Sequence, residues 1–156
     1  MAILRDRDSH LDEGYRQLFD PATRLPRPAL LRDRLEVALA RATRTKRRVG
    51  VLFVDVEVPD DIPSGRGSSF DVLPLIAGRL RSAVRPDDTV ARVGEHEFVV
   101  ICNDVTDDLD LAAVAERLES VIGVRIFLDE AKSVLSARVE ARLGAPGDRA
   151  VDLLTR

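Results

Sequence analysis

The chain has few aromatic residues: they make up 4% of its 156 residues, and tryptophan is absent. A buried core must therefore be built from leucine, isoleucine, valine and alanine. The one cysteine, Cys102, excludes a disulfide within the chain and suits a reducing compartment. A catalytic thiol needs a nearby base and access to solvent, and a plain buried cysteine is the simpler interpretation of this apolar position.

Long apolar runs are also absent. None approaches the roughly 20 residues that span a bilayer, and the N-terminal MAILRDRDSH is charged too early for the apolar segment of a signal peptide. We therefore expect a cytoplasmic protein without a membrane span. The net charge of −3 gives no overall attraction to nucleic acid, so we expect no such partner. A hydrophobic fraction of 45% and a charged fraction of 33% are typical of a soluble globular domain.

The strongest local signal lies between Arg85 and Cys102, in RPDDTVARVGEHEFVVIC. Apolar runs at 89–93 and 98–102 predict two strands, and the glycine and polar residues between them predict a tight hairpin turn. This turn would present its three polar side chains together at a sheet edge. The candidate catalytic residues there are Glu95, His96 and Glu97.

Hydrophobic periodicity predicts the remaining elements. Helices are expected at 9–19, 28–44, 70–85 and 111–121, with a short one from 148, and strands at 49–58, 124–128 and 133–143. This order contains the βαββαβ pattern of a ferredoxin-like α+β domain, for which we expect a central, largely antiparallel sheet covered by helices on one face. Residues 1–19 would be an N-terminal helix or linker that packs on its own domain or on a second copy, and residues 20–156 the domain.

The predicted strand at 49–58, VGVLFVDVEV, begins as a continuous apolar run, which is typical of a central strand buried on both faces. It ends with an alternation that places Asp55 and Glu57 on the same face. Acids at the end of a central strand are frequent metal ligands. An ordinary polar strand end explains them equally well, and both interpretations remain open.

Four segments, in order, resemble the GGDEF domain of diguanylate cyclases. DPATRLP at 20–26 resembles DPLTGLPNR, LFVDVE at 52–57 resembles the metal-binding LFLDID, RPDDTVARVGEHEF at 85–98 resembles RxxDxxARxGGDEF, and AERL at 115–118 matches the helix that follows. The resemblance extends from residue 20 to the C-terminus and implies a nucleotidyl cyclase-type fold. It also implies a reaction, in which active members join two GTP molecules into cyclic di-GMP across a dimer.

The resemblance also exposes changes at the catalytic positions. Asp55 matches the family's first metal ligand, but His96 replaces the second, and imidazole is a poor ligand for Mg²⁺. Glu95 replaces a glycine that lets the backbone approach the triphosphate, while Glu97 is retained. We therefore expect these positions to be remnants of an active site, without cyclase activity. Asp55 would be a weak metal ligand at most. Mg²⁺ or Mn²⁺ would be bound only if GTP binding persists.

The family's phosphate and guanine loop is also altered. Its lysine and asparagine correspond here to Asp60 and Pro63, and Asp71 is a candidate for its second guanine contact. These changes add to the expectation that the domain is not an enzyme.

A second family site is retained. Arg85 and Asp88 match the RxxD of the inhibitory product site, and Arg117 matches an arginine that completes it. A guanidinium pairs with phosphate and with guanine acceptors, so the resemblance implies cyclic di-GMP as ligand and a role in its signalling. The structural alternative is that Arg85 caps a helix and Asp88 fixes a turn. Two further hypotheses are an interaction or dimerisation module without nucleotide, and a residual cyclase using Asp55, His96 and Glu97.

Overall fold

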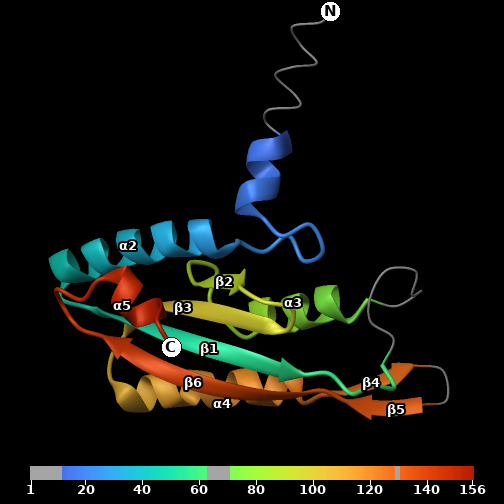
Figure 1. Cartoon of the computed structure of the whole chain (residues 1–156). Helices are drawn as coiled ribbons and strands as arrows, with labels where there is room; N and C mark the ends of the chain where they lie inside the picture. The colour runs from blue at the N-terminus through green and yellow to red at the C-terminus, as the bar shows by residue number, and fades with distance from the viewer. Residues whose placement is uncertain (1–11, 63–70, 129–130) are drawn as a thin grey trace, which may run out of the picture.

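The structure, a computed structural model, describes residues 12–62, 71–128 and 131–156 (Figure 1). A short helix spans residues 12–18. The other helices are α2 (Pro28–Thr45), α3 (Val72–Ser82), α4 (Asp108–Ile122) and α5 (Ala150–Leu154). The strands are β1 (Arg48–Glu57), β2 (Thr89–Arg92), β3 (Glu97–Val105), β4 (Arg125–Leu128), β5 (Ala131–Val134) and β6 (Ser136–Gly144).

The central sheet has four strands in the order β2-β3-β1-β6, and every neighbouring pair is antiparallel. The predicted α+β class with a ferredoxin-like, nucleotidyl cyclase-type sheet is therefore confirmed. One detail differs: the single strand predicted at 133–143 is divided at Leu135. Residues 131–134 pair with β4 in a separate hairpin, while β6 pairs with β1. A hairpin between segments so close in sequence requires little loop-closure entropy.

Helices cover both faces of the sheet, so the expectation that they cover one face was wrong. Figure 1 shows α2 and α5 on one side of the sheet and α4 on the other. The reason lies in β1, whose continuous apolar run supplies alternate side chains to two cores. Val49, Val51 and Phe53 pack against α2 and α5. Leu52, Val54 and Val56 pack against α3 and α4.

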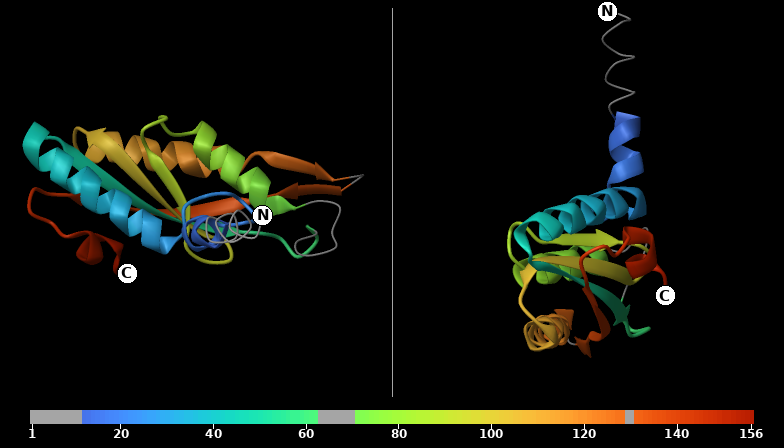
Figure 2. Two further views of the ribbon diagram at one scale, coloured as in Figure 1. Left: turned by 90° about the horizontal axis from the view of Figure 1, so that it is seen from above. Right: turned by 90° about the vertical axis from the view of Figure 1, so that its left-hand side faces the viewer.

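The helix at 12–18 stands away from the sheet (Figures 1 and 2). Its apolar side chains Tyr15 and Leu18 are 48% and 40% exposed. It is joined to the domain near α2, where the Arg27 backbone N–H donates to the Leu18 carbonyl at 2.7 Å and its Nη1 donates to the Arg16 carbonyl at 3.1 Å. The described residues of this helix therefore contact the domain through the Arg16 and Leu18 carbonyls, while the Tyr15 and Leu18 side chains stay partly exposed.

Helix α2 follows the expected pattern. Pro28 opens it, where the missing N–H costs nothing. Leu31, Leu35, Ala38 and Ala42 form its buried stripe, at spacings of three to four residues. None of the helices that the structure describes is long and apolar enough to cross a membrane.

Candidate functional site

The GEHEF segment forms the predicted hairpin turn between β2 and β3. The backbone N–H groups of Val93 and Gly94 both donate to the Glu97 carbonyl, at 2.9 and 3.2 Å. The Val56 N–H donates to the His96 carbonyl at 2.9 Å and ties the turn to β1. Glu95 and Glu97 are exposed, whereas His96 is half-buried. The turn therefore does not present the three side chains equally to solvent.

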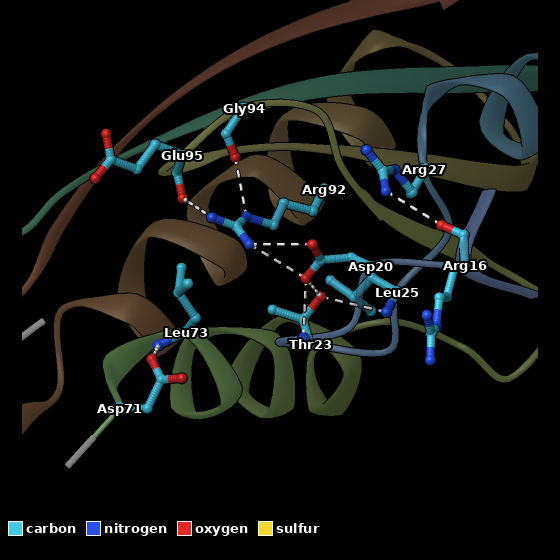
Figure 3. A network of polar contacts seen from close by, with 10 residues as sticks. All are labelled: Arg16, Asp20, Thr23, Leu25, Arg27, Asp71, Leu73, Arg92, Gly94 and Glu95. Atoms are coloured by element: carbon cyan, nitrogen blue, oxygen red, sulfur yellow. Dashed lines mark hydrogen bonds and ion pairs between the residues drawn. The ribbon is translucent and has the colours of Figure 1, made fainter. Parts of the chain in front are cut away.

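Arg92 holds this turn from within (Figure 3). Its Nε donates to the Gly94 carbonyl at 3.0 Å, and its Nη2 donates to the Glu95 carbonyl at 2.9 Å. Its Nη1 donates to both carboxylate oxygens of Asp20, at 3.1 and 3.2 Å. One guanidinium thus joins the GEHEF turn to the segment before α2. Arg92 and Asp20 both lie in segments that resemble the family, but the sequence alone did not predict a role for either residue.

Asp20 is positioned by its own loop. Its Oδ2 accepts from the Thr23 backbone N–H at 2.9 Å and from the Thr23 hydroxyl at 2.7 Å. Burial by itself would raise the pKa of Asp20. The hydrogen bonds from Thr23 and the charge of Arg92 outweigh burial, so the pKa lies below its ordinary value. Asp20 is consequently ionised at neutral pH and pairs with Arg92.

Asp55, the candidate metal ligand, is engaged by Arg156. In the sheet register Asp55 lies opposite Glu97 on β3 and opposite Arg138 on β6. Arg156 donates from Nη1 to one Asp55 oxygen at 3.1 Å and from Nη2 to the other at 2.7 Å. The Arg156 hydrogen bond is the main cause that holds the pKa of Asp55 below its ordinary value. No sequence signal pointed to Arg156, because the contact joins distant parts of the chain.

The catalytic positions do not assemble a metal site in this arrangement. Within residues 12–62, 71–128 and 131–156, no group of three or more His, Cys, Asp or Glu side chains could hold a metal ion. His96 supplies a nitrogen and Asp55 is paired with Arg156, so this donor set differs from the oxygen ligands that Mg²⁺ prefers. Of the altered guanine loop, Asp60 is exposed and Pro63 lies outside the described residues. Asp71 caps α3, accepting from the Leu73 N–H at 3.0 Å.

Arg85, Asp88 and Arg117 line one surface depression of about 370 Å³. It lies where the end of α3, the segment before β2, the end of β3 and α4 meet. Arg85 and Arg117 are exposed and Asp88 is half-buried. The structure thus brings together the three residues that the sequence singled out for a ligand site.

Two of the three also have structural roles. The Asp88 carboxylate accepts from the Arg85 backbone N–H at 3.0 Å and, through its other oxygen, from the Asn103 N–H at 2.9 Å. Arg117 donates through Nε to the Ala83 carbonyl at 2.7 Å. Asp88 therefore fixes the turn before β2, as the structural alternative predicted. Because these bonds use only part of each group, further donors and acceptors remain for a ligand.

Cys102 lies on the wall of the same depression and is buried. Burial, with a smaller contribution from the negative charge of Asp88, raises the pKa of its thiol to about 12. The thiol is therefore protonated at neutral pH and is a poor nucleophile. The prediction of a plain buried cysteine is confirmed.

The chain is similar to a known family of domains. Residues 17–146 match the family model "Diguanylate cyclase, GGDEF domain". The bifunctional diguanylate cyclase/cyclic di-GMP phosphodiesterase MucR of Pseudomonas aeruginosa is 37% identical over 133 residues, covering 84% of this chain and 19% of MucR. The diguanylate cyclase TpbB of the same species is 30% identical over 135 residues, covering 85% of this chain and 31% of TpbB. The chain thus spans less than a third of the length of either relative.

Solved structures show the same fold. The GGDEF domain of P. aeruginosa TpbB superposes with a TM-score of 0.76 at 28% identity, covering 87% of this chain and 81% of that domain. A sensory box/GGDEF family protein from Caulobacter crescentus gives a TM-score of 0.75 at 26% identity, covering 88% of this chain and 90% of that one. With a family model matched over most of its length, the chain belongs to the GGDEF domain family.

Proposed function

We propose that this GGDEF domain acts in cyclic di-GMP signalling by binding the dinucleotide at Arg85, Asp88 and Arg117 without synthesising it. The observation that supports it best is that these three side chains, drawn from two separate segments of the chain, line one depression. Among the relatives, MucR is named as a diguanylate cyclase/cyclic di-GMP phosphodiesterase and TpbB as a diguanylate cyclase.

The chemistry of the depression suits a cyclic dinucleotide. Its two phosphates carry two negative charges, and two guanidiniums, Arg85 and Arg117, lie at the depression. A guanidinium has five N–H donors in a planar fork, of which Arg117 uses Nε for Ala83. The Asp88 carboxylate has about four acceptor positions and uses two of them for backbone N–H groups, so it can accept from guanine N–H donors.

The proposed loss of cyclic di-GMP synthesis rests on residues of the GEHEF turn and of β1. Glu95 places a carboxylate where the triphosphate would approach, and like charges repel. His96 offers nitrogen where Mg²⁺ prefers oxygen. Asp55 is engaged by Arg156, so its carboxylate is already paired with a cation.

Isothermal titration with cyclic di-GMP tests the proposed binding. We expect saturable binding by the wild-type chain, and loss of that binding in Arg85→Ala and Arg117→Ala. Arg44→Ala is the matched control, because Arg44 is an exposed arginine in the last turn of α2 and does not line this depression. The absence of heat at tens of micromolar dinucleotide would contradict the proposal.

A second candidate function is an interaction or dimerisation module without nucleotide. The exposed Tyr15 and Leu18 on the helix at 12–18 favour it, because apolar side chains on a projecting helix are frequent contact residues. Light scattering of wild type and the Tyr15→Ser/Leu18→Ser variant tests it. Self-association that needs these two residues and is indifferent to Arg85→Ala supports this candidate, and a monomer at all concentrations argues against dimerisation.

Residual cyclase activity is tested separately. Incubation of the chain with GTP and either Mg²⁺ or Mn²⁺, followed by chromatography of the nucleotides, should yield no cyclic di-GMP. Any product that disappears in Asp55→Ala would show that the catalytic positions still act.

A further inference from the structure

We propose a second anion site at the β2 edge of the sheet, which takes a phosphate-bearing small molecule of about nucleotide size. It goes beyond the proposed cyclic di-GMP site and does not depend on it. Strand β2 lies at one edge of the sheet. A depression of about 360 Å³ lies beside it, lined by residues from α2, α3 and the segment before α2. Four arginines line it: Arg24, Arg34, Arg81 and Arg85.

The charge of this depression is unbalanced. Asp88 is the one acidic residue among the described residues that line it, and both of its carboxylate oxygens accept backbone N–H groups. Among the described residues, the four arginine side chains have no ion-pair partner within 4.0 Å. All four are exposed, so their N–H groups are available to a ligand. An anion held between them would relieve the mutual repulsion of these like charges.

Arg24 adds an independent observation. Its backbone is left-handed, with φ of 60°, a conformation that glycine adopts freely and residues with a Cβ adopt only at a cost. Its N–H donates to the Asp20 carbonyl at 2.7 Å, within the loop held by Thr23 and Arg92. In the DPLTGLPNR pattern that residues 20–26 resemble, this position is glycine. A long cation therefore stands where the backbone favours glycine, and such strained residues concentrate at functional sites.

The shape of the depression favours a small ligand over a protein segment or nucleic acid. Its volume of 360 Å³ is within the range of small-molecule pockets. Arginine forks pair two N–H groups with two phosphate oxygens. Phe19 and Pro86 provide an apolar surface on which a ring can lie. The charge is also local, because the whole chain carries −3 and would not attract a nucleic acid backbone.

The two depressions can be separated by substitution. Arg85 and Asp88 line both, whereas Arg24, Arg34 and Arg81 line only the one beside β2, and Arg117 lines only the other. Substitutions of Arg24, Arg34 or Arg81 therefore test the new site alone. Arg117→Ala reports on the proposed cyclic di-GMP site alone.

Titration with GMP and inorganic pyrophosphate, with guanosine as the phosphate-free comparison, tests the inference. We expect GMP and pyrophosphate to bind the wild type and guanosine to bind at least about tenfold more weakly. The Arg34→Ala/Arg81→Ala variant should lose at least about tenfold in affinity for GMP, whereas Arg117→Ala should retain wild-type affinity. The same double variant should keep its affinity for cyclic di-GMP.

Arg24→Gly keeps the test decisive even if the double variant fails to fold. Glycine removes the left-handed strain, so this variant should unfold at a higher temperature than wild type while binding GMP more weakly. The inference is overturned by the absence of GMP and pyrophosphate binding, by equal binding of guanosine, or by GMP binding that Arg24→Gly leaves unchanged. It is likewise overturned if Arg117→Ala abolishes GMP binding, because the ligand would then occupy the other depression.

Discussion

Arg156 holds Asp55 with both arms of its guanidinium, at 3.1 and 2.7 Å, while the same group lies over the Phe53 ring, 4.9 Å from its centroid. Arg142 stacks on the same ring at 4.8 Å and donates to the Leu153 carbonyl at 3.2 Å. The end of α5 and the residues after it are therefore held to β1 and β6 by two arginines. This arrangement pairs Asp55, which the family resemblance predicts to be a metal ligand, with a cation from its own chain.

Arg156→Ala should raise the pKa of Asp55 toward 3.8, because the Arg156 hydrogen bond is the main cause that lowers it. Stability should fall by less than about 1 kcal/mol, since both side chains of the pair are more than a third exposed to solvent. A carboxyl-carbon NMR titration measures the pKa. Arg149→Ala, which removes an exposed ion pair with Asp152, is the control and should leave Asp55 unchanged. An Asp55 pKa that does not move in Arg156→Ala would contradict the pairing.

Asp20→Asn should destabilise the domain at neutral pH, because it removes a carboxylate that accepts from both Thr23 and Arg92. The pKa of Asp20 is lower in the folded chain than its unfolded value of 3.8. Its contribution is therefore fully present above the unfolded value and is lost as the pH falls through the lower, folded pKa. We expect a loss of about 1–3 kcal/mol at pH 7, as for hydrogen bonds to charged groups.

Urea unfolding of wild type and Asp20→Asn at a series of pH values measures this difference. The difference in free energy of unfolding between wild type and Asp20→Asn should decrease as the pH falls below 3.8. Asp152→Asn, at an exposed ion pair on α5, is the matched control and should show little difference at any pH. A difference in free energy of unfolding that does not change with pH would mean that the charge of Asp20 does not stabilise the fold.

Local patterns predicted the parts of the fold that depend on neighbours in sequence. Alternation and turn chemistry placed the hairpin around Gly94, and helical spacing placed α2. The convergence of Arg85, Asp88 and Arg117 on one depression was inferred only through the family resemblance. The contact of Arg156 with Asp55 was not predictable, since nothing local to either residue encodes a pairing between the C-terminal segment and β1. The apolar run in β1 predicts coverage of both sheet faces, whereas the βαββαβ pattern alone predicts helices on one face.

Cys102 should resist thiol reagents in the folded chain, because burial raises the pKa of its thiol to about 12 and only the thiolate reacts quickly. Reaction with a chromogenic disulfide reagent at pH 8 should be slow under native conditions and rapid after addition of denaturant. The denatured chain serves as the control for reagent quality. Rapid reaction of the native chain would show that the wall of the depression opens and that Cys102 is accessible.

Replacing GEHEF by GGDEF in the turn should not by itself create a strong metal site, because Asp55 remains paired with Arg156. We compare Glu95→Gly/His96→Asp with the same variant carrying Arg156→Ala. Removing the guanidinium frees the Asp55 carboxylate, and the exposed ion pair is worth up to about 1 kcal/mol, so Mn²⁺ should bind up to about fivefold more tightly in the triple variant. Electron paramagnetic resonance of free Mn²⁺ measures both affinities. Arg149→Ala in place of Arg156→Ala controls for the loss of a positive charge on the same segment and should give no gain. Equal Mn²⁺ affinity in the double and triple variants would mean that Arg156 does not compete with a cation for Asp55.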